Sequence, residues 1–422
     1  MRLLIIYPHW PPSNAVGAHR VRLIANELPA MGCDVTVLTV DERDYEEPHG
    51  IETERLVSPQ VHVVKVRAKP ILQILGKRLI GDLGLRAFVS LRTEAGRLLA
   101  EAIKRDVPFS FVWFSLPSWY PALLGPGISK RFKVPYGIDY QDPWVFELSP
   151  EERGFNRATA TRTLARLLEP IALKRVSLIS GISEGYLHGI RCRYPKKQGI
   201  PFVAAQLGFS AADHKIEIQG LALPFEPGKR TYVYAGAHWS MGAPLFRLVM
   251  ESIARLKTMG KLPSDVQFLF VGTSNPALPS IQEQAMSMGL EGVVRELPER
   301  QPYLCVQHYL RHANGAMIIG SVQPHYSASK IFQCLITAKR VFAFFHHESE
   351  AARILRECDA DDYFVRFEPG RLDPEMLAET LLAFVQPEAP FQPNLAALEP
   401  YSARSSASKL LATIAEIRHI KP

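Results

Sequence analysis

The chain has 422 residues, of which 47% are apolar and 22% charged, with a formal net charge of +7. This length predicts two domains of roughly 200 residues each, and the composition excludes a disordered, collagen-like or coiled-coil chain. The apolar runs are shorter than a membrane-spanning helix requires, no signal-peptide pattern opens the sequence, and five scattered cysteines favour a reducing, cytoplasmic location.

Strand and helix patterns alternate through the first half of the chain. An apolar run over 2–7 predicts a buried strand, helical spacing over 17–31 predicts a helix ended by Gly32, and the β-branched run 34–40 predicts a second strand. This order is a βαβ unit, which belongs to a parallel sheet. We expect further strands at 61–66, 109–114, 134–139 and 177–183, and a helix at 157–174.

The alternation pauses over 207–230, where turn residues and weak periodicity indicate a linker. It then resumes, with strands expected at 231–235, 266–271, 316–319 and 340–345, a helix at 243–259 and a last helix at 403–417. The chain is therefore expected to form two doubly wound α/β domains in series, each with a parallel sheet.

Ligands of such sheets bind beyond the carboxyl ends of the strands, which directs attention to the loops 8–20, 139–147, 236–243, 272–276 and 320–333. The glycine fingerprints of dinucleotide-dependent oxidoreductases and of P-loop NTPases do not occur in the sequence. In the last loop, Ser327 and Ser329 precede Lys330 where a helix begins, and free helical N–H groups favour an anion. This segment is either a diphosphate seat or an ordinary serine cap with a solvated lysine.

The order of these pieces resembles a GT-B-fold glycosyltransferase, similar to family 4 of the retaining enzymes. The resemblance is carried by Pro11–Gly17, Met31–Val37, Ile138–Trp144 (IDYQDPW), Ile179–Glu184 (ISGISE), Tyr234–Gly236, Phe270–Gly272 and Tyr326–Phe332 (YSASKIF). It implies two Rossmann-like domains facing a central cleft. Residues 1–206 would bind the acceptor, residues 207–402 would bind the nucleotide sugar, and the last segment, 403–422, would pack back on the first domain.

The resemblance also implies a set of site residues. Asp142 and Gln141 stand where many members carry a His-Asp pair, and a carboxylate there could orient the acceptor or stabilise oxocarbenium-like charge. Asp142 also precedes a proline, as ordinary turn residues do. Two family glutamates with seven residues between them are replaced by His325, a candidate catalytic residue, and Gln333. Donor-binding residues are expected at Gly17, Gly236, His238, Gly272, Thr273, Arg295, Ser327, Ser329, Lys330 and Gln333.

In many members an arginine–lysine pair follows the first glycine turn of the second domain and neutralises the diphosphate. This chain has neither residue there, so His238, Lys330 and Arg20 are the cations that remain for the donor. His308 with His312, and His346 with His347, have no third ligand at a suitable spacing, so no metal site is expected.

The activity implied is transfer of a sugar from a UDP- or GDP-linked donor to a glycan or lipid-linked hydroxyl, with retention of configuration and without metal or cofactor. Two alternatives stay open. A degenerate glycosyltransferase, suggested by His325 and Gln333, would bind nucleotide or a partner subunit without turnover. A non-hydrolysing sugar-nucleotide epimerase would share the two-domain architecture.

The positive charge is concentrated in the first half of the chain. Residues 1–200 contain 28 Lys and Arg against 20 Asp and Glu, while the rest carries a net charge of −1. No basic block interleaved with aromatic residues points to a nucleic acid. Within Lys69–Arg105, eight basic residues interleave with Leu and Ile, which favours a basic amphipathic helix on an anionic membrane over a helix packed on the sheet. Reversing Lys77, Arg78 and Arg86 is expected to release the folded protein from the inner face of the cell membrane.

Overall fold

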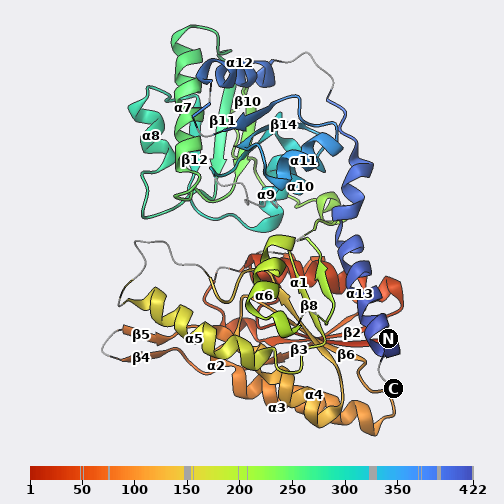
Figure 1. The fold of residues 1–422 in the computed structure, drawn as a ribbon. Coiled ribbons are helices and arrows are strands. Elements are labelled where there is room, and N and C mark those ends of the chain that lie inside the picture. The colour runs from red at the N-terminus through yellow and green to blue at the C-terminus, as the bar shows by residue number, and fades with distance from the viewer. Residues whose placement is uncertain are drawn as a thin grey trace. The chain divides into compact units, whose positions relative to one another are not determined.

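The computed structural model describes residues 1–47, 49–50, 52–74, 77–146, 154, 156–197, 199–206, 208–322, 330–368, 370–371, 373–386 and 391–420. The chain divides into two compact units (Figure 1), which we call unit 1 (Met1–Gly208 with Tyr401–Pro422) and unit 2 (Phe209–Pro400). No helix in the described part of the chain combines the length and the apolar character needed to cross a bilayer.

Unit 1 is built on a parallel sheet with the strand order β3-β2-β1-β6-β7-β8-β9. Its strands are β1 (Arg2–Ile6), β2 (Asp34–Val40), β3 (Val61–Val66), β6 (Phe111–Ser115), β7 (Tyr136–Tyr140), β8 (Leu178–Gly181) and β9 (Phe202–Ala204). Successive side chains point to opposite faces, so that Leu4 and Ile6 enter one core and Leu3 and Ile5 the other. Both faces are therefore apolar and both need a cover of helices.

Helices supply that cover on the two faces of the sheet. On one face, α1 (Val16–Glu27) packs beside the C-terminal α13 (Ala403–Ile420). The other face is covered by α2 (Leu83–Arg86), α3 (Phe88–Lys104), α4 (Gly125–Phe132), α5 (Arg157–Ala172) and α6 (Glu184–Arg193). Side-chain caps start three of these helices: Asp82 accepts from the backbone of Leu85 at 2.7 Å, Asn156 from that of Thr159 at 2.9 Å, and Ser183 from that of Tyr186 at 3.3 Å.

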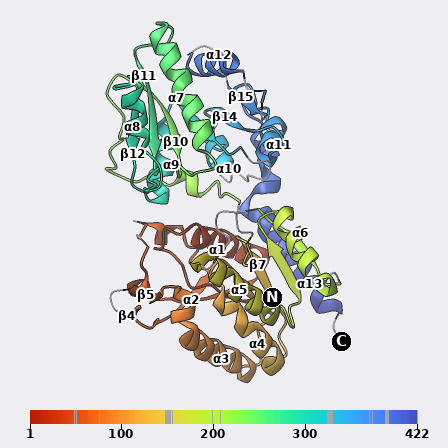
Figure 2. The ribbon, with the colours of Figure 1, turned by 60° about the vertical axis from the view of Figure 1, so that its left-hand side comes forward.

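Unit 2 contains a second parallel sheet, with the strand order β12-β11-β10-β13-β14-β15. Its strands are β10 (Arg230–Ala235), β11 (Val266–Val271), β12 (Val294–Leu297), β13 (Gly315–Ile319), β14 (Arg340–His346) and β15 (Phe364–Phe367). One face is covered by α7 (Ala243–Thr258), α8 (Ile281–Ser287) and α12 (Pro374–Val385), of which α7 and α12 lie side by side (Figures 1 and 2). The remaining helices are α9 (Tyr303–His312), α10 (Lys330–Leu335) and α11 (Glu350–Glu357).

The expected pair of doubly wound α/β domains is confirmed, since every strand pair in both sheets is parallel. The first helix is shorter than predicted. It ends at Glu27 because Pro29, which has no N–H to donate, starts a separate 3-10 turn over Pro29–Met31. Gly32 closes that turn with a φ of +78°, in the left-handed region where glycine is favoured.

The prediction of a basic amphipathic helix early in Lys69–Arg105 is wrong. An antiparallel hairpin forms there, from β4 (Leu72–Ile74) and β5 (Lys77–Ile80), because Leu72 and Ile74 alternate with a polar residue at the spacing of a strand. Arg86 is only 7% exposed, and its guanidinium donates to the carbonyls of Lys69 and Asp44 at 3.1 and 2.8 Å. Reversal of Arg86 would therefore disrupt unit 1 instead of releasing a folded protein.

Candidate functional site

Each sheet has one switch point, where the chain turns from one half of the sheet to the other. In unit 1 the strands run outward from β1 to β3 and from β6 to β9, so the switch point lies between β1 and β6. In unit 2 it lies between β10 and β13. Ligands of open α/β sheets bind beside such points, at the carboxyl ends of the strands. The loops predicted from the sequence at 8–20, 236–243 and 320–333 follow these strands.

A buried polar network lies behind the site of unit 1. The Arg20 guanidinium binds the Asp139 carboxylate through two hydrogen bonds of 2.8 Å, and neither side chain is exposed. Arg20 also donates to the carbonyl of Gln206 at 2.7 Å, and Ser115 and Ser180 donate to Asp139 at 3.1 and 2.8 Å. Arg20, expected as a free cation for the donor, is therefore committed to the interior of unit 1.

Gln141 and Gly17 complete this network at the end of β7. The Gln141 amide donates to Ser115 Oγ at 2.8 Å and to the Gly17 carbonyl at 3.4 Å, and Gln141 is only 5% exposed. A Cβ atom on Gly17 would overlap the hydroxyl of Tyr7. Gln141 and Gly17 are thus placed to hold the start of α1 against β1 and β7, and Gln141 offers little surface to a substrate.

Asp142, the next residue, is exposed. Surrounding protein nevertheless desolvates its carboxyl group and raises its pKa. Burial raises the pKa of Tyr7, the residue after β1, and the negative charges of Glu47, Asp142 and Asp82 raise it further, so these carboxylates act on the end of β1. Gln141 and Asp142 are the catalytic residues predicted in this unit. Of the two, Asp142 has an accessible side chain, and it lies beyond the end of β7.

His9 is a candidate that the sequence analysis missed. It follows β1 closely, and its Nδ1 lies 2.6 Å from Oε1 of Glu47, to which Ser13 also donates at 2.5 Å. Burial alone would raise the pKa of Glu47, but the hydrogen bonds from His9 and Ser13 lower it to about 2. The ionised Glu47 therefore orients the His9 ring. The available signal was a histidine just beyond the strand end, inside a loop already singled out.

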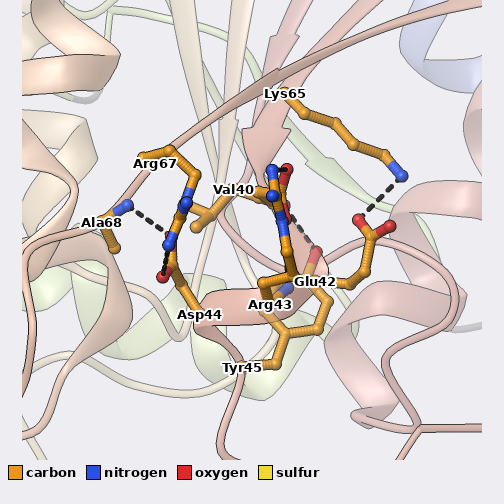
Figure 3. A network of polar contacts seen from close by, with 9 residues as sticks. Val40, Glu42, Arg43, Asp44, Tyr45, Lys65, Arg67 and Ala68 are labelled. Carbon is orange, nitrogen blue, oxygen red and sulfur yellow. Dashed lines mark hydrogen bonds and ion pairs between the residues drawn. The ribbon is translucent and has the colours of Figure 1, made fainter.

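An ion-pair network fixes the segment that carries Glu47 (Figure 3). After β2, Glu42 accepts from Lys65 at 2.8 Å, and Asp44 accepts from Arg67 at 2.8 and 2.9 Å, which ties this segment to the end of β3. The Tyr45 hydroxyl donates to the last carbonyl of β2 at 2.9 Å and accepts from the loop after β1 at 3.0 Å. These contacts bring the ends of β1, β2 and β3 together and pair two of the cations of unit 1.

Unit 2 brings Lys330 and Gly236 together at its switch point. Gly236 follows β10 with a φ of +155°, and a Cβ atom there would overlap the Lys330 amine. The amine lies 3.4 Å from the Tyr234 hydroxyl, and burial lowers the pKa of Lys330 to about 8, with a further lowering from the charge of Arg300. The absent side chain of Gly236 therefore provides the space in which a desolvated cation sits.

His238 lies in the same loop and is 2% exposed. Desolvation lowers the pKa of its imidazole, and its Nε2 atom has no hydrogen-bond partner among the described residues. The loop is held to the end of β13, since the Val322 amide donates to the Met241 carbonyl at 3.3 Å. The loop that carries Gly236 therefore also carries a buried imidazole nitrogen without a partner among the described residues.

Gln333 is engaged inside unit 2. Its Oε1 accepts from Gln307 at 2.8 Å, lies 2.8 Å from His214 Nε2 and 3.5 Å from the Tyr303 hydroxyl. Burial lowers the pKa of His214 to about 4, so the neutral ring must carry its proton on Nε2 to donate. The amide oxygen is therefore saturated, and the amide N–H groups are the part of Gln333 that suits a ligand.

The remaining candidates of unit 2 have different surroundings. Gly272 follows β11 with a φ of +73°, and the buried Thr273 donates to Glu296 at 2.5 Å. Arg295 lies within β12 and donates to the carbonyl of Pro224 at 3.1 Å, so it is not brought to the residues at the strand ends. The candidates His325, Ser327 and Ser329 lie outside the described residues.

Because the Lys330 amine occupies the space beside Gly236, a side chain at position 236 is expected to lower the free energy of unfolding strongly. In Gly236→Ala, the added methyl overlaps the lysine amine and the backbone is strained, so we expect a loss of about 2–4 kcal/mol in unfolding free energy, measured in urea. Gly228→Ala is the control, because Gly228 also has a positive φ (+76°) but no atom within 4 Å of the added Cβ. Equal losses in the two variants, or no relief of the Gly236→Ala loss in a Lys330→Ala background, would contradict the fit.

Comparisons with known proteins agree with this architecture. Residues 17–204 match the family described as glycosyl transferase 4-like domain. No curated protein matches the chain by sequence. Among solved structures, HepE (Alr3699) of Anabaena in complex with UDP is 13% identical with a TM-score of 0.57, over 99% of this chain and 100% of that one.

Two further structures give the same result. A glycosyltransferase from Rickettsia africae is 13% identical with a TM-score of 0.60, over 100% of this chain and 99% of that one. A protein from Listeria monocytogenes, assigned as a UDP-N-acetylglucosamine 2-epimerase, is 13% identical with a TM-score of 0.52, over 98% and 96% of the two chains. Identities this low show the fold alone, and that fold is GT-B.

Proposed function

We propose that this chain is a glycosyltransferase that moves a sugar from a nucleotide-sugar donor to a hydroxyl acceptor. The match of residues 17–204 to the glycosyl transferase 4-like domain and the GT-B fold of the chain support this proposal. The observation that carries the proposal is the seat at the switch point of unit 2. There a desolvated lysine amine occupies the space left by Gly236, and the buried His238 leaves one ring nitrogen unbonded among the described residues. A desolvated cation and a nearby polar atom suit a diphosphate.

We propose UDP or GDP as the nucleotide, and the solved complex of HepE with UDP supports the first. Unit 2 would hold this donor, with Gln333 offering amide N–H groups to the ribose hydroxyls. Unit 1 would hold a glycan or lipid-linked acceptor at the cytoplasmic face of the cell membrane. The product would enter a cell-surface glycan or glycoconjugate.

We further propose transfer with retention of configuration and without a divalent metal. Asp142 would be the carboxylate that stabilises positive charge developing at the anomeric carbon. Lys330 would stabilise the diphosphate as it leaves, in the role that a metal ion plays elsewhere. His9, which contacts Glu47 at 2.6 Å, would assist the acceptor hydroxyl.

The activity is tested by nucleoside diphosphate release with and without acceptor. Release that needs an acceptor supports the transferase. If the protein binds nucleotide sugar but releases no nucleoside diphosphate with any acceptor, the degenerate alternative is supported. The contact of Gln333 with His214 is one reason to consider that alternative, because it occupies the amide oxygen. Conversion of the donor sugar to its epimer without an acceptor would support the epimerase.

Loss of the lysine amine should weaken donor binding. For Lys330→Ala, we expect calorimetry to show a loss of about 1.5–3 kcal/mol for the nucleotide sugar, the range for hydrogen bonds to charged groups, and almost no loss for the free nucleoside. Since the pKa of Lys330 is about 8, the amine loses its charge above that pH, so wild-type affinity should fall as pH rises through it. Lys330→Ala should show no such fall. Equal losses for nucleoside and nucleotide sugar would exclude a diphosphate seat.

A further inference from the structure

The outer side of α5 carries an apolar stripe that belongs to none of the hydrophobic cores seen in the described part of the chain. Ala160, Leu164, Leu167 and Ile171 follow one another at alternating spacings of four and three residues, which places them on one side of the helix. Leu164, Leu167 and Ile171 are 43%, 64% and 51% exposed. The opposite side of α5 is buried in the core of unit 1, for example through Ala165. A helix already anchored by one side thus presents a second apolar side to its surroundings.

Exposed cations lie near this stripe. Lys174 and Arg175 follow the end of α5, and Arg166 lies about 100° around the helix from Leu167. No exposed acid within 157–175 balances them. Arg166, Lys174 and Arg175 are exposed. Lys197 donates to the carbonyl of Lys174 at 3.2 Å, which adds a further lysine beside the end of the helix. The acid that the sequence places within 157–175, Glu169, is fully buried and bonded inside unit 1. We call the stripe and the three exposed cations the α5 face.

The other long helix on the same side of unit 1 has a different surface. On α3 the exposed apolar residues Val89 and Ile103 lie near opposite ends of the helix and form no stripe. Its Arg97 binds Glu94 at 2.5 Å and Glu101 at 2.6 Å, so its charge is balanced. Although α3 falls in the segment expected to meet a membrane, its surface is that of an ordinary solvated helix.

We propose that the α5 face docks on an anionic lipid surface. Apolar side chains in line, flanked by basic residues, can enter the headgroup region of a bilayer while the cations meet lipid phosphates. A second copy of this chain fits less well, because two α5 faces would set cations against cations. The proposal extends the proposed function to the membrane that holds a lipid-linked acceptor. Vesicle binding needs neither donor nor turnover, so the lipid-binding proposal and the proposed transferase activity can be contradicted independently of each other.

The test is co-sedimentation of the full chain with phosphatidylcholine vesicles that contain or lack phosphatidylglycerol. We expect binding to the anionic vesicles alone, which weakens as salt rises. Leu164→Ser/Leu167→Ser/Ile171→Ser should weaken binding at least about tenfold. Arg166→Gln/Lys174→Gln/Arg175→Gln should weaken it about a hundredfold at low salt and remove most of the salt dependence. Since all six side chains are exposed, thermal unfolding should hardly change.

Val89→Ser/Ile103→Ser on α3 is the matched control and should bind like the wild type. No binding of the wild type to anionic vesicles would overturn the proposal, as would α5 variants that bind normally. If only the α3 control lost vesicle binding, the lipid-binding surface would lie on α3 and the proposal would be wrong. If the wild type were a dimer that the serine variant converts to monomers, the stripe would be a contact between helices instead of a lipid-binding surface.

Discussion

Asp142→Asn is expected to lower kcat about 100-fold or more while leaving donor affinity nearly unchanged, as removal of an interaction made only in the transition state does. The asparagine keeps the shape of the side chain and removes the negative charge that would stabilise an oxocarbenium-like centre. The donor is expected on unit 2, where this change alters nothing. Because desolvation raises the pKa of Asp142, wild-type activity should decline on acidification at a higher pH than for an ordinary aspartate.

The matched control is Asp106→Asn. Asp106 is also an exposed aspartate of unit 1, but it follows α3 at the amino side of the sheet, away from the carboxyl ends of the strands. Its left-handed φ of +57° is one that asparagine tolerates well. Full activity in Asp142→Asn, measured by initial rates at saturating donor, would remove the catalytic role and leave the fold assignment intact.

The regular elements could be predicted because their patterns are local. The apolar runs of β1, β2, β10 and β11 need no information from the rest of the chain, and their order alone indicated two parallel sheets. The β4–β5 hairpin was missed because leucines and isoleucines among basic residues fit the spacing of a helix as well as that of a strand. Arg86 was taken as a surface charge, since its carbonyl partners at Lys69 and Asp44 depend on the tertiary fold.

The positions of the site residues could be predicted from the sequence, but the contacts that these residues make could not. Gly236 and Lys330 were both assigned to the donor, and the adjacency of β10 and β13 explains how residues so distant in sequence meet. Nothing in the local sequence indicates that Asp139 would form an ion pair with Arg20, or that His214 would form a hydrogen bond with the amide oxygen of Gln333. In each case the partner that removes a side chain from the ligand is more than a hundred residues away, and local patterns carry no information at that distance.

The Arg20–Asp139 pair should have the largest effect on stability. Asp139→Asn leaves an unexposed guanidinium without its carboxylate, and breaking one side of a buried ion pair costs about 3–5 kcal/mol. Urea unfolding, followed by fluorescence, measures this loss directly. Asp34→Asn is the control, because Asp34 pairs with Arg2 at 2.9 Å but is 61% exposed, so its loss should stay below about 1 kcal/mol.

A second variant separates the pair from its packing. Arg20→Met/Asp139→Leu replaces both charges by apolar side chains, and such replacements of buried pairs are often neutral or stabilising. Here Ser115 and Ser180 would lose the carboxylate to which they donate, so we expect the double variant to recover only part of the loss seen in Asp139→Asn. A double variant less stable than Asp139→Asn would mean that shape, not the unpaired Arg20 charge, sets the cost. An Asp139→Asn protein as stable as the wild type would show that the neutral amide still satisfies Arg20, and that the charge of Asp139 contributes little to holding β7 against α1.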